Sequence, residues 1–256
     1  MMVIVYQTLV GRNRVWMAWL RSSPKVWDDI HRGGLDREGG IWDYTRSQLR
    51  HSGPILYLKD KMRAGENPSS IWDVACNVGF HLLEVESMYP GAQLFASDIS
   101  HVMVEETERN CKRCHADVFD MGSLIEDEAP LLPFGNRTFS TILLSDVVYY
   151  VPFGGYAPIV LRQCQWCRNT QAVLSAQKRL IDRLVDVTEK EIIISWHENN
   201  EVVVDMMKNL AVPSVRMGKN FVYIINAKRW KEARSSNSWL DSNERSPNLR
   251  SGRLDW

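Results

Sequence analysis

Two aspartates at the ends of apolar segments are the residues of this chain whose types and spacing point most clearly to chemistry. Asp73 lies in IWDVACNVGF, 71–80, where a strand-like run leads into a turn of small residues, and Asp98 lies in LFASDIS, 94–100. The residues between them suffice for a loop, a helix through HLLEVESMY and a return strand. Both carboxylates should therefore emerge at the same edge of a parallel sheet, which is the local geometry of a nucleotide-type cofactor site.

Strands and helices alternate along the chain from residue 71, as is typical of a doubly wound sheet. We expect strands at 71–75, 93–97, 114–118, 139–145 and 191–196, helices at 79–89 and 100–110, and a mostly helical segment at 157–188. A further helix at 199–211 precedes two closely spaced strands, VPSVRM at 212–217 and FVYIINAKRW at 221–230. These last two strands are expected to pair antiparallel at the edge of the sheet.

The pattern predicts an α/β fold with a doubly wound, seven-stranded sheet, mostly parallel with an antiparallel last strand, in three α/β/α layers. We expect an N-terminal helical segment at 1–70 that covers the cofactor edge, the sheet domain at 71–230, and a disordered tail rich in Ser, Asn and Arg at 231–256. Within the first part, MMVIVYQTLV is expected to be a strand or arm. GPILYLKDKMRAG is expected to be a helix opened by Pro54 and closed at Gly65.

Composition argues against several classes of protein. The chain has 256 residues, 45% of them apolar, and a formal net charge of zero, so it can bury a core but carries no general footprint for nucleic acid or anionic membranes. No run of about 18 apolar residues occurs, so no membrane span is expected. The apolar start lacks the basic region and cleavage pattern of a signal peptide, and a cytoplasmic protein is therefore expected.

Five cysteines, an odd number, favour reduced thiols over a disulfide framework. Cys111 with Cys114 and Cys164 with Cys167 form two C-x-x-C pairs, the ligand set of a structural zinc site. In the predicted topology the first pair lies at the entry to the third strand and the second on the helix after the fourth. Free thiols without a metal are therefore preferred, and zinc is the alternative. Cys76 is expected to be a small packing residue.

Four blocks, in order, make the region 71–229 resemble a class I S-adenosylmethionine-dependent methyltransferase. They are IWDVACNVGF, SDIS at 97–100, HADVFD at 115–120 and LLPFGNRTFSTILLSDVVYYVP at 131–152. The resemblance implies a Rossmann-like methyltransferase domain, with S-adenosyl-L-methionine as cofactor and methyl transfer to an oxygen or nitrogen atom of a small-molecule or sugar-like substrate. An RNA substrate is an alternative, because Arg and Lys occur in the N-terminal segment.

The resemblance also implies roles for individual residues. Asp73 matches the acid that interacts with the amino group of the cofactor's methionine moiety, and Asp98 matches the acid that binds both ribose hydroxyls. Ile99 would pack on the adenine, and Asp117 with Val118 would bind the exocyclic amine and the neighbouring ring nitrogen. The turn residues and the end of the fourth strand complete the expected cofactor site: Ala75, Asn77, Gly79, Phe80 and Ser145.

The turn departs from the family pattern of acid-x-Gly-x-Gly-x-Gly, because Ala75 and Asn77 stand at the first two glycine positions. Asn adopts positive φ more readily than most residues, and Ala has the smallest side chain after Gly, so the turn remains feasible. The two lost glycines also leave open a non-catalytic, degenerate Rossmann-like interaction domain. A dinucleotide-binding oxidoreductase is disfavoured, since its G-x-G-x-x-G fingerprint does not follow the first strand.

Candidate catalytic residues follow the predicted fourth and fifth strands. Asp146 comes directly after the fourth strand and His197 ends the fifth, at the edge where substrates bind in this topology, so either could act as general base. Tyr149, with the neighbouring Tyr150, is expected to shape the substrate pocket. His81, at the start of the helix after the turn, would face the cofactor edge or be a solvated helix residue.

Overall fold

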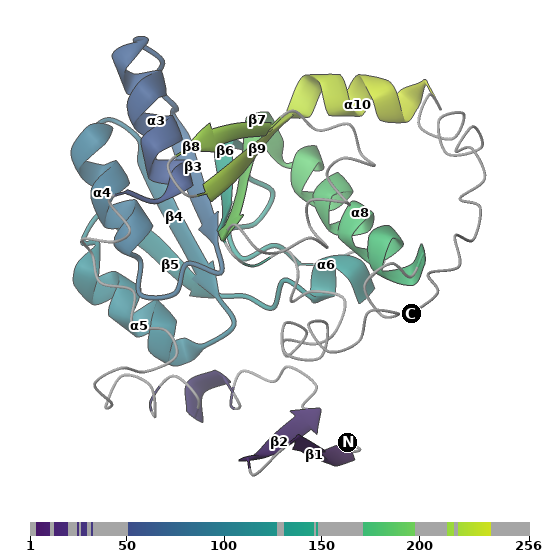
Figure 1. The fold of residues 1–256 in the computed structure, drawn as a ribbon. Helices are drawn as coiled ribbons and strands as arrows, with labels where there is room; N and C mark the ends of the chain where they lie inside the picture. The colour runs from purple at the N-terminus through teal and green to yellow at the C-terminus, as the bar shows by residue number, and fades with distance from the viewer. Residues whose placement is uncertain are drawn as a thin grey trace.

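The computed structural model describes residues 4–10, 13–19, 25, 27–29, 32, 51–126, 131–145, 147, 171–197, 214–217 and 220–236. A seven-stranded sheet forms the centre of this part of the chain (Figure 1). Its strands are β3 (Ser70–Val74), β4 (Gln93–Asp98), β5 (Cys114–Val118), β6 (Phe139–Ser145), β7 (Thr188–His197), β8 (Ser214–Met217) and β9 (Asn220–Asn226).

The strand order is β5-β4-β3-β6-β7-β9-β8. The pairs from β5 to β7 are parallel, whereas β9 runs antiparallel to both β7 and β8. From β3 the chain adds β4 and β5 on one side of the sheet and then returns to add β6 and β7 on the other side. The reversal therefore lies between β3 and β6, and this is the topological switch point of a doubly wound sheet. The predicted fold class is confirmed, including the antiparallel pairing of the last two strands.

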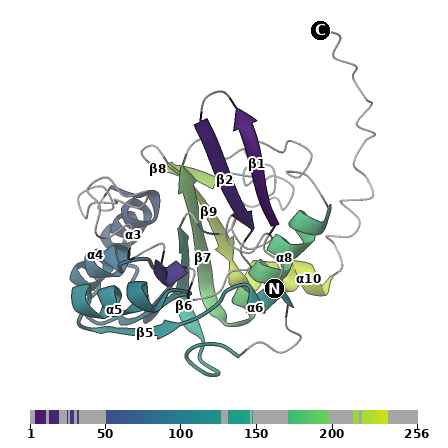
Figure 2. The ribbon, with the colours of Figure 1, turned by 90° about the horizontal axis from the view of Figure 1, so that it is seen from below.

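Helices cover both faces of the sheet (Figures 1 and 2). One face carries α3 (Gly53–Arg63), α4 (Phe80–Met88) and α5 (His101–Asn110), and the other carries α6 (Ser123–Glu126), α8 (Gln171–Asp186) and α10 (Ala227–Ser235). The three-layer arrangement explains why the central strands read as continuous apolar runs, because both of their faces are buried.

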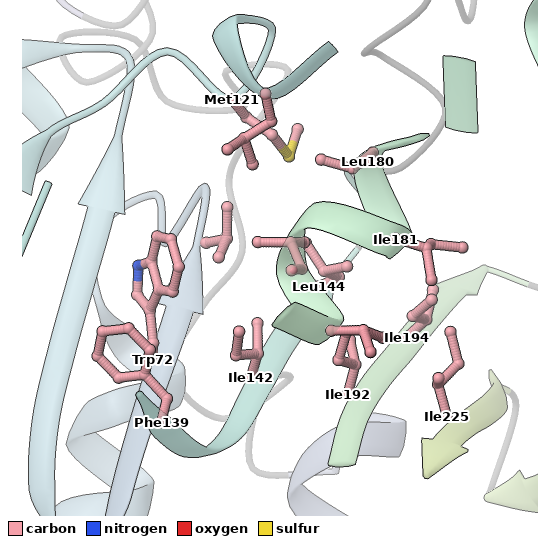
Figure 3. Close-up of a cluster of buried hydrophobic side chains, with 14 of the residues drawn as sticks. Trp72, Met121, Phe139, Ile142, Leu144, Leu180, Ile181, Ile192, Ile194 and Ile225 are labelled. Atoms are coloured by element: carbon pink, nitrogen blue, oxygen red, sulfur yellow. The ribbon is translucent and has the colours of Figure 1, made fainter. Parts of the chain in front are cut away.

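Alternate residues of the central strands enter two separate cores. Ile142 of β6 and Ile192 of β7 face α8, where Leu180 and Ile181 are fully buried (Figure 3). Leu143 lies next to Ile142 in the chain but joins the second core, with buried side chains of α3 and α4. Since side chains alternate across a strand, this second face is also the face of Asp73. The carboxylate therefore lies on the side of the sheet that α3 and α4 cover.

The N-terminal part combines strands with a helix. β1 (Ile4–Val10) and β2 (Asn13–Trp19) form a two-stranded antiparallel sheet, so the helical segment predicted for 1–70 begins with strands in its first residues. The expected helix opened by proline is α3, whose first turn contains Pro54. Gly65 follows this helix with a φ of 80°, in the left-handed conformation expected of a glycine that ends a helix.

The last predicted strand, 221–230, is too long. β9 ends at Asn226, whose side chain accepts a hydrogen bond from the backbone N–H of Arg229 at 3.0 Å and so caps the start of α10. Trp230 on α10 is buried. The helix continues to Ser235, beyond the predicted domain end at 230. The rest of the predicted tail and the helix predicted for 199–211 lie outside the described residues.

The cysteine prediction is corrected by a disulfide between Cys111 and Cys114, whose Cα atoms are 5.4 Å apart. The backbone N–H of Cys114 donates to the carbonyl of Cys111, and the tight turn between α5 and β5 brings the two residues within disulfide range. Cys164 and Cys167 are outside the described residues. In the described part, Cys76 is a buried free thiol and no group of His, Cys, Asp and Glu could hold a metal ion.

Among the described residues, no helix combines the length and the apolar character that a membrane span requires.

Candidate functional site

The turn between β3 and α4 adopts an unusual backbone conformation. Ala75, Asn77 and Gly79 have φ values of 59°, 52° and 73°, so alternate residues are left-handed, at the three positions where the resembled family has glycine. The prediction that Asn and Ala can support this turn is confirmed. Ala75 is the costly member, because a left-handed residue with a Cβ is strained by about 1–2 kcal/mol and alanine lacks the short polar side chain that lets asparagine tolerate this conformation.

Two side chains of α5 hold the turn from one side. Thr107 Oγ1 donates to the carbonyl of Asn77 at 2.9 Å, and Asn110 Nδ2 donates to the carbonyl of Val78 at 2.8 Å. A Cβ at Gly79 would lie 2.7 Å from Thr107 Cγ2, so this glycine is required by close packing as well as by its φ. Sequence reasoning missed Thr107 and Asn110, because helix residues some thirty positions away carry no local signal of this contact.

Asp98 connects the turn to the end of β4. Its Oδ2 accepts from the backbone N–H of Asn77 at 3.1 Å, and its Oδ1 accepts from that of Ser100 at 3.0 Å. Burial raises the pKa of Asp98 to about 6, although these backbone hydrogen bonds act in the opposite direction. A carboxylate offers about four acceptor positions, so Asp98 retains acceptor capacity for a ligand hydroxyl.

Asp73 lies two positions before the turn's first left-handed residue and is almost fully buried, at 1% exposure. Neither carboxylate oxygen has a hydrogen-bond partner among the residues that the structure describes. Burial, and then repulsion from Asp98, raises the pKa of Asp73 to about 8. A buried carboxylate without partners is costly, and such groups mark sites where a ligand is expected to supply the partner.

His81 and Ser52 lie next to Asp73. His81 Nδ1 is 3.8 Å from Asp73 Oδ2, and His81 Nε2 is 3.1 Å from Ser52 Oγ. His81 is buried, which lowers its pKa to about 4 and keeps the ring neutral. Of the two predicted possibilities for His81, the solvated helix residue is wrong.

Asp28 reaches the same edge from the N-terminal part of the chain. Its Oδ1 accepts hydrogen bonds from Ser100 Oγ at 2.8 Å and from the backbone N–H of Val102 at 3.3 Å, at the start of α5. Burial acts to raise the pKa of Asp28, but the hydrogen bonds from Ser100 and Val102, with the nearby His101, lower it below the ordinary value. Sequence reasoning missed Asp28, since the adjacent pair of aspartates at 28 and 29 in a tryptophan-rich segment gave no motif.

The other predicted cofactor residues lie at the same carboxyl edge of the sheet. Ile99, half-buried, follows Asp98, and the register of β4 and β5 places Asp117 beside Ser97 and Val118 beside Asp98. Asp117 is exposed, and its Oδ1 accepts from the N–H of Val118 at 2.8 Å. Two further predicted residues occupy element ends: Phe80 is the first residue of α4 and Ser145 is the last residue of β6.

The predicted catalytic residues are only partly placed. His197 is the last residue of β7, at the same edge of the sheet, and only its backbone position is described. Ser195 of the same strand donates from Oγ to Ser145 Oγ at 3.3 Å. Asp146, Tyr149 and Tyr150 lie outside the described residues, so their predicted roles stay predictions.

Comparison with known proteins finds similarity in structures alone. No protein-family model matches the chain, and no curated protein matches it. A magnesium protoporphyrin IX methyltransferase from Synechocystis PCC 6803 is similar with a TM-score of 0.48 and 11% identity, covering 79% of this chain and 94% of that one. An O-methyltransferase family protein from Burkholderia thailandensis has a TM-score of 0.49 and 9% identity, over 80% of this chain and 63% of that one.

The N-methyltransferase NodS from Bradyrhizobium japonicum WM9 is similar with a TM-score of 0.47 and 12% identity, over 77% of this chain and 96% of that one. Identities this low leave the chemistry of the present chain to be argued from its own residues.

Proposed function

We propose that this chain is an S-adenosylmethionine-dependent methyltransferase that acts on an oxygen or nitrogen atom of a small-molecule or sugar-like substrate. The observation that carries the proposal is the buried Asp73, whose carboxylate oxygens have no partner among the described residues. It lies directly before a turn with three left-handed residues, and Asp98 accepts from the turn's central amide. An amine ligand would supply the missing donors.

The described residues fit the groups of this cofactor. Asp73 would hold the ammonium of its methionine moiety, and the left-handed turn would let the cofactor lie against the backbone. Asp98 would accept from the ribose hydroxyls through its remaining acceptor positions. Ile99 would pack on the adenine, and Asp117 with Val118 would bind the adenine's edge. When bound, the cofactor supplies a methyl group that is activated by its bond to a positively charged sulfonium sulfur.

Charge distinguishes this cofactor from a dinucleotide. A dinucleotide places its pyrophosphate at the turn and the start of the following helix. Here Asp73 is buried at that turn, and Asp98 is near enough to contribute to its raised pKa. Asp28 is likewise near enough to Asp98 to contribute to the raised pKa of Asp98. Asp98, with a pKa of about 6, is mostly anionic at pH 7 and would repel a pyrophosphate, as would Asp73 in its anionic form. The ammonium and sulfonium of S-adenosylmethionine are positively charged and would be attracted.

The protein's share of the reaction would be positioning of the two reactants and exclusion of water. Asp146 and His197 are the proposed general bases, with Tyr149 in the wall of the substrate pocket. The segment around Asp28 is proposed to cover the cofactor edge, since Asp28 binds Ser100 and Val102 beside Asp98.

Native mass spectrometry of the full chain tests the choice of cofactor. The protein would be mixed in separate samples with S-adenosylmethionine, its demethylated product S-adenosylhomocysteine, and NAD. We expect one bound copy of each of the first two ligands and none of NAD. Binding of NAD alone would instead support an oxidoreductase, and binding of none of the three would support the non-catalytic domain.

A further inference from the structure

Ser52 occupies the N-cap position of α3 but does not cap the helix. A serine at this position ordinarily accepts a hydrogen bond from an amide in the first helical turn. Here the side chain makes no capping hydrogen bond, and its Oγ lies 3.1 Å from His81 Nε2, on the next helix. The hydroxyl therefore hydrogen-bonds to the imidazole of His81 and not to an amide of its own helix.

His81 lies between Ser52 and the carboxylate of Asp73. Its second nitrogen, Nδ1, is 3.8 Å from Asp73 Oδ2, in surroundings where the histidine is buried and Asp73 is 1% exposed. A neutral imidazole carries one N–H and one acceptor nitrogen, and the partner of one nitrogen decides which nitrogen holds the proton. A hydroxyl that donates to Nε2 leaves the proton on Nδ1, facing Asp73.

We propose that Ser52 and His81 are a positioning pair for Asp73: Ser52 donates to Nε2, and the Nδ1–H of His81 faces the carboxylate and favours its anionic form. An anionic Asp73 is the form that binds an amine. The identity of that amine, the ammonium of S-adenosylmethionine, rests on the proposed function, whereas the pair itself can be tested without any cofactor.

The other titratable groups around Asp73 make such support necessary. Burial opposes ionisation of Asp73, and Asp98 on β4 also repels a second negative charge. The thiol of Cys76 in the turn stays neutral, because burial raises its pKa well above the ordinary value. The N–H dipole of His81 on α4, with Nδ1 3.8 Å from Asp73 Oδ2, offsets these effects in part by electrostatic attraction, since a positive group facing a carboxylate favours its charged form.

The order Ser52, His81, Asp73 also resembles the arrangement of a hydrolase triad, in which the serine is a nucleophile. Two features argue against that role. The lowered pKa of His81, about 4, makes it a weak base, and the 3.8 Å from Nδ1 to Asp73 is longer than a hydrogen bond. Covalent labelling of Ser52 by a serine-reactive fluorophosphonate would overturn the positioning role, which predicts no labelling.

The direct test is a ¹³C NMR titration of the Asp73 side-chain carboxyl in the full chain, without ligand. In His81→Phe and in Ser52→Ala we expect the acid dissociation constant of Asp73 to fall, which is a rise in its pKa; the fall should be roughly threefold in His81→Phe, which loses the facing N–H dipole. His81→Asn can place an amide N–H near the Nδ1 position and should restore the wild-type titration. An unchanged titration in both disrupting variants would overturn the proposal, and Ser52→Ala alone decides if His81→Phe does not fold.

Asn226→Ala is the matched control, because it removes the cap of α10, which lies on the other face of the sheet. It should lower stability without changing the Asp73 titration. In a second arm, calorimetry at pH 7 should show S-adenosylhomocysteine binding roughly threefold more weakly to His81→Phe than to the wild type or His81→Asn, in proportion to the smaller anionic fraction of Asp73. If the NMR result is as expected but the wild type binds no cofactor, the pair stands and the proposed function fails.

Discussion

Replacement of Asp73 by Asn should make the ligand-free protein more stable while weakening cofactor binding. In the folded chain the pKa of Asp73 is raised from 3.8 to about 8, chiefly by burial. A group whose pKa is raised on folding contributes its full stability below the unfolded pKa, and that contribution is lost as the pH rises towards the folded pKa. Asn has a similar shape and no charge, so the variant does not lose folding stability at this position as the pH rises.

The size of the effect follows from the two pKa values. At pH 7 the ordinary pKa of 3.8 lies about three units below the solution pH, and each unit corresponds to about 1.36 kcal/mol, so the upper bound is about 4 kcal/mol. Local relaxation around a buried carboxylate reduces this, and a gain of at least about 2 kcal/mol is expected at pH 7. Near pH 4 the gain should vanish, because Asp73 is then neutral in the folded protein and about half neutral in the unfolded chain.

Urea unfolding of wild type and Asp73→Asn at pH 4, 5.5 and 7, followed by circular dichroism, measures this difference in the free energy of unfolding. Asp117→Asn is the control, because Asp117 is exposed and a substitution at the surface should change the free energy of unfolding little. A difference that stays constant across pH, or a variant less stable than the wild type at pH 7, would refute the claim that Asp73 is a buried carboxyl whose pKa is raised on folding.

Further predictions concern the turn and the disulfide. Ala75→Gly should raise the free energy of unfolding by roughly 0.5–1 kcal/mol in urea titrations, because relief of left-handed strain exceeds the extra entropy of glycine in the unfolded chain; a loss would contradict the assigned φ of 59°. Gly79→Ala should cost about 2–4 kcal/mol in the same assay, since its Cβ would meet Thr107 Cγ2 at 2.7 Å; a neutral result would contradict that packing. Reduction of the Cys111–Cys114 disulfide should cost at most about 2 kcal/mol, because the closed loop is short; a larger loss in thermal unfolding with a reductant would show that the disulfide does more than restrict the unfolded chain.

The sheet could be predicted from the sequence because its signal is local. Phe139–Ser145 is buried on both faces and therefore reads as a continuous apolar run. Asp73 and Asp98 each stand near the carboxyl end of their strand, β3 and β4, beside the point where the strand order reverses. The conformation of Asn77 was also accessible, since asparagine tolerates positive φ. These features depend on residue type and near neighbours alone.

The contacts that complete the site could not be predicted in this way. Asp28 with Ser100, Thr107 with the carbonyl of Asn77, and Ser52 with His81 join residues 72, 30 and 29 positions apart. No periodicity or spacing rule encodes which helix side chain reaches which turn. The start of α10 is different, because Asn226 followed by AKRWKEAR is a helix-start signal that the apolar run FVYIIN obscured.

The central claim is that Asp98 and the turn before it bind S-adenosylmethionine. The most direct measurement is isothermal titration calorimetry of S-adenosylhomocysteine with the wild type and with Asp98→Ala, using circular dichroism to confirm that the variant is folded. Loss of hydrogen bonds from two ribose hydroxyls to a charged acceptor should weaken binding at least about 100-fold. A wild type that gives no binding heat, or a folded variant with unchanged affinity, would contradict the account.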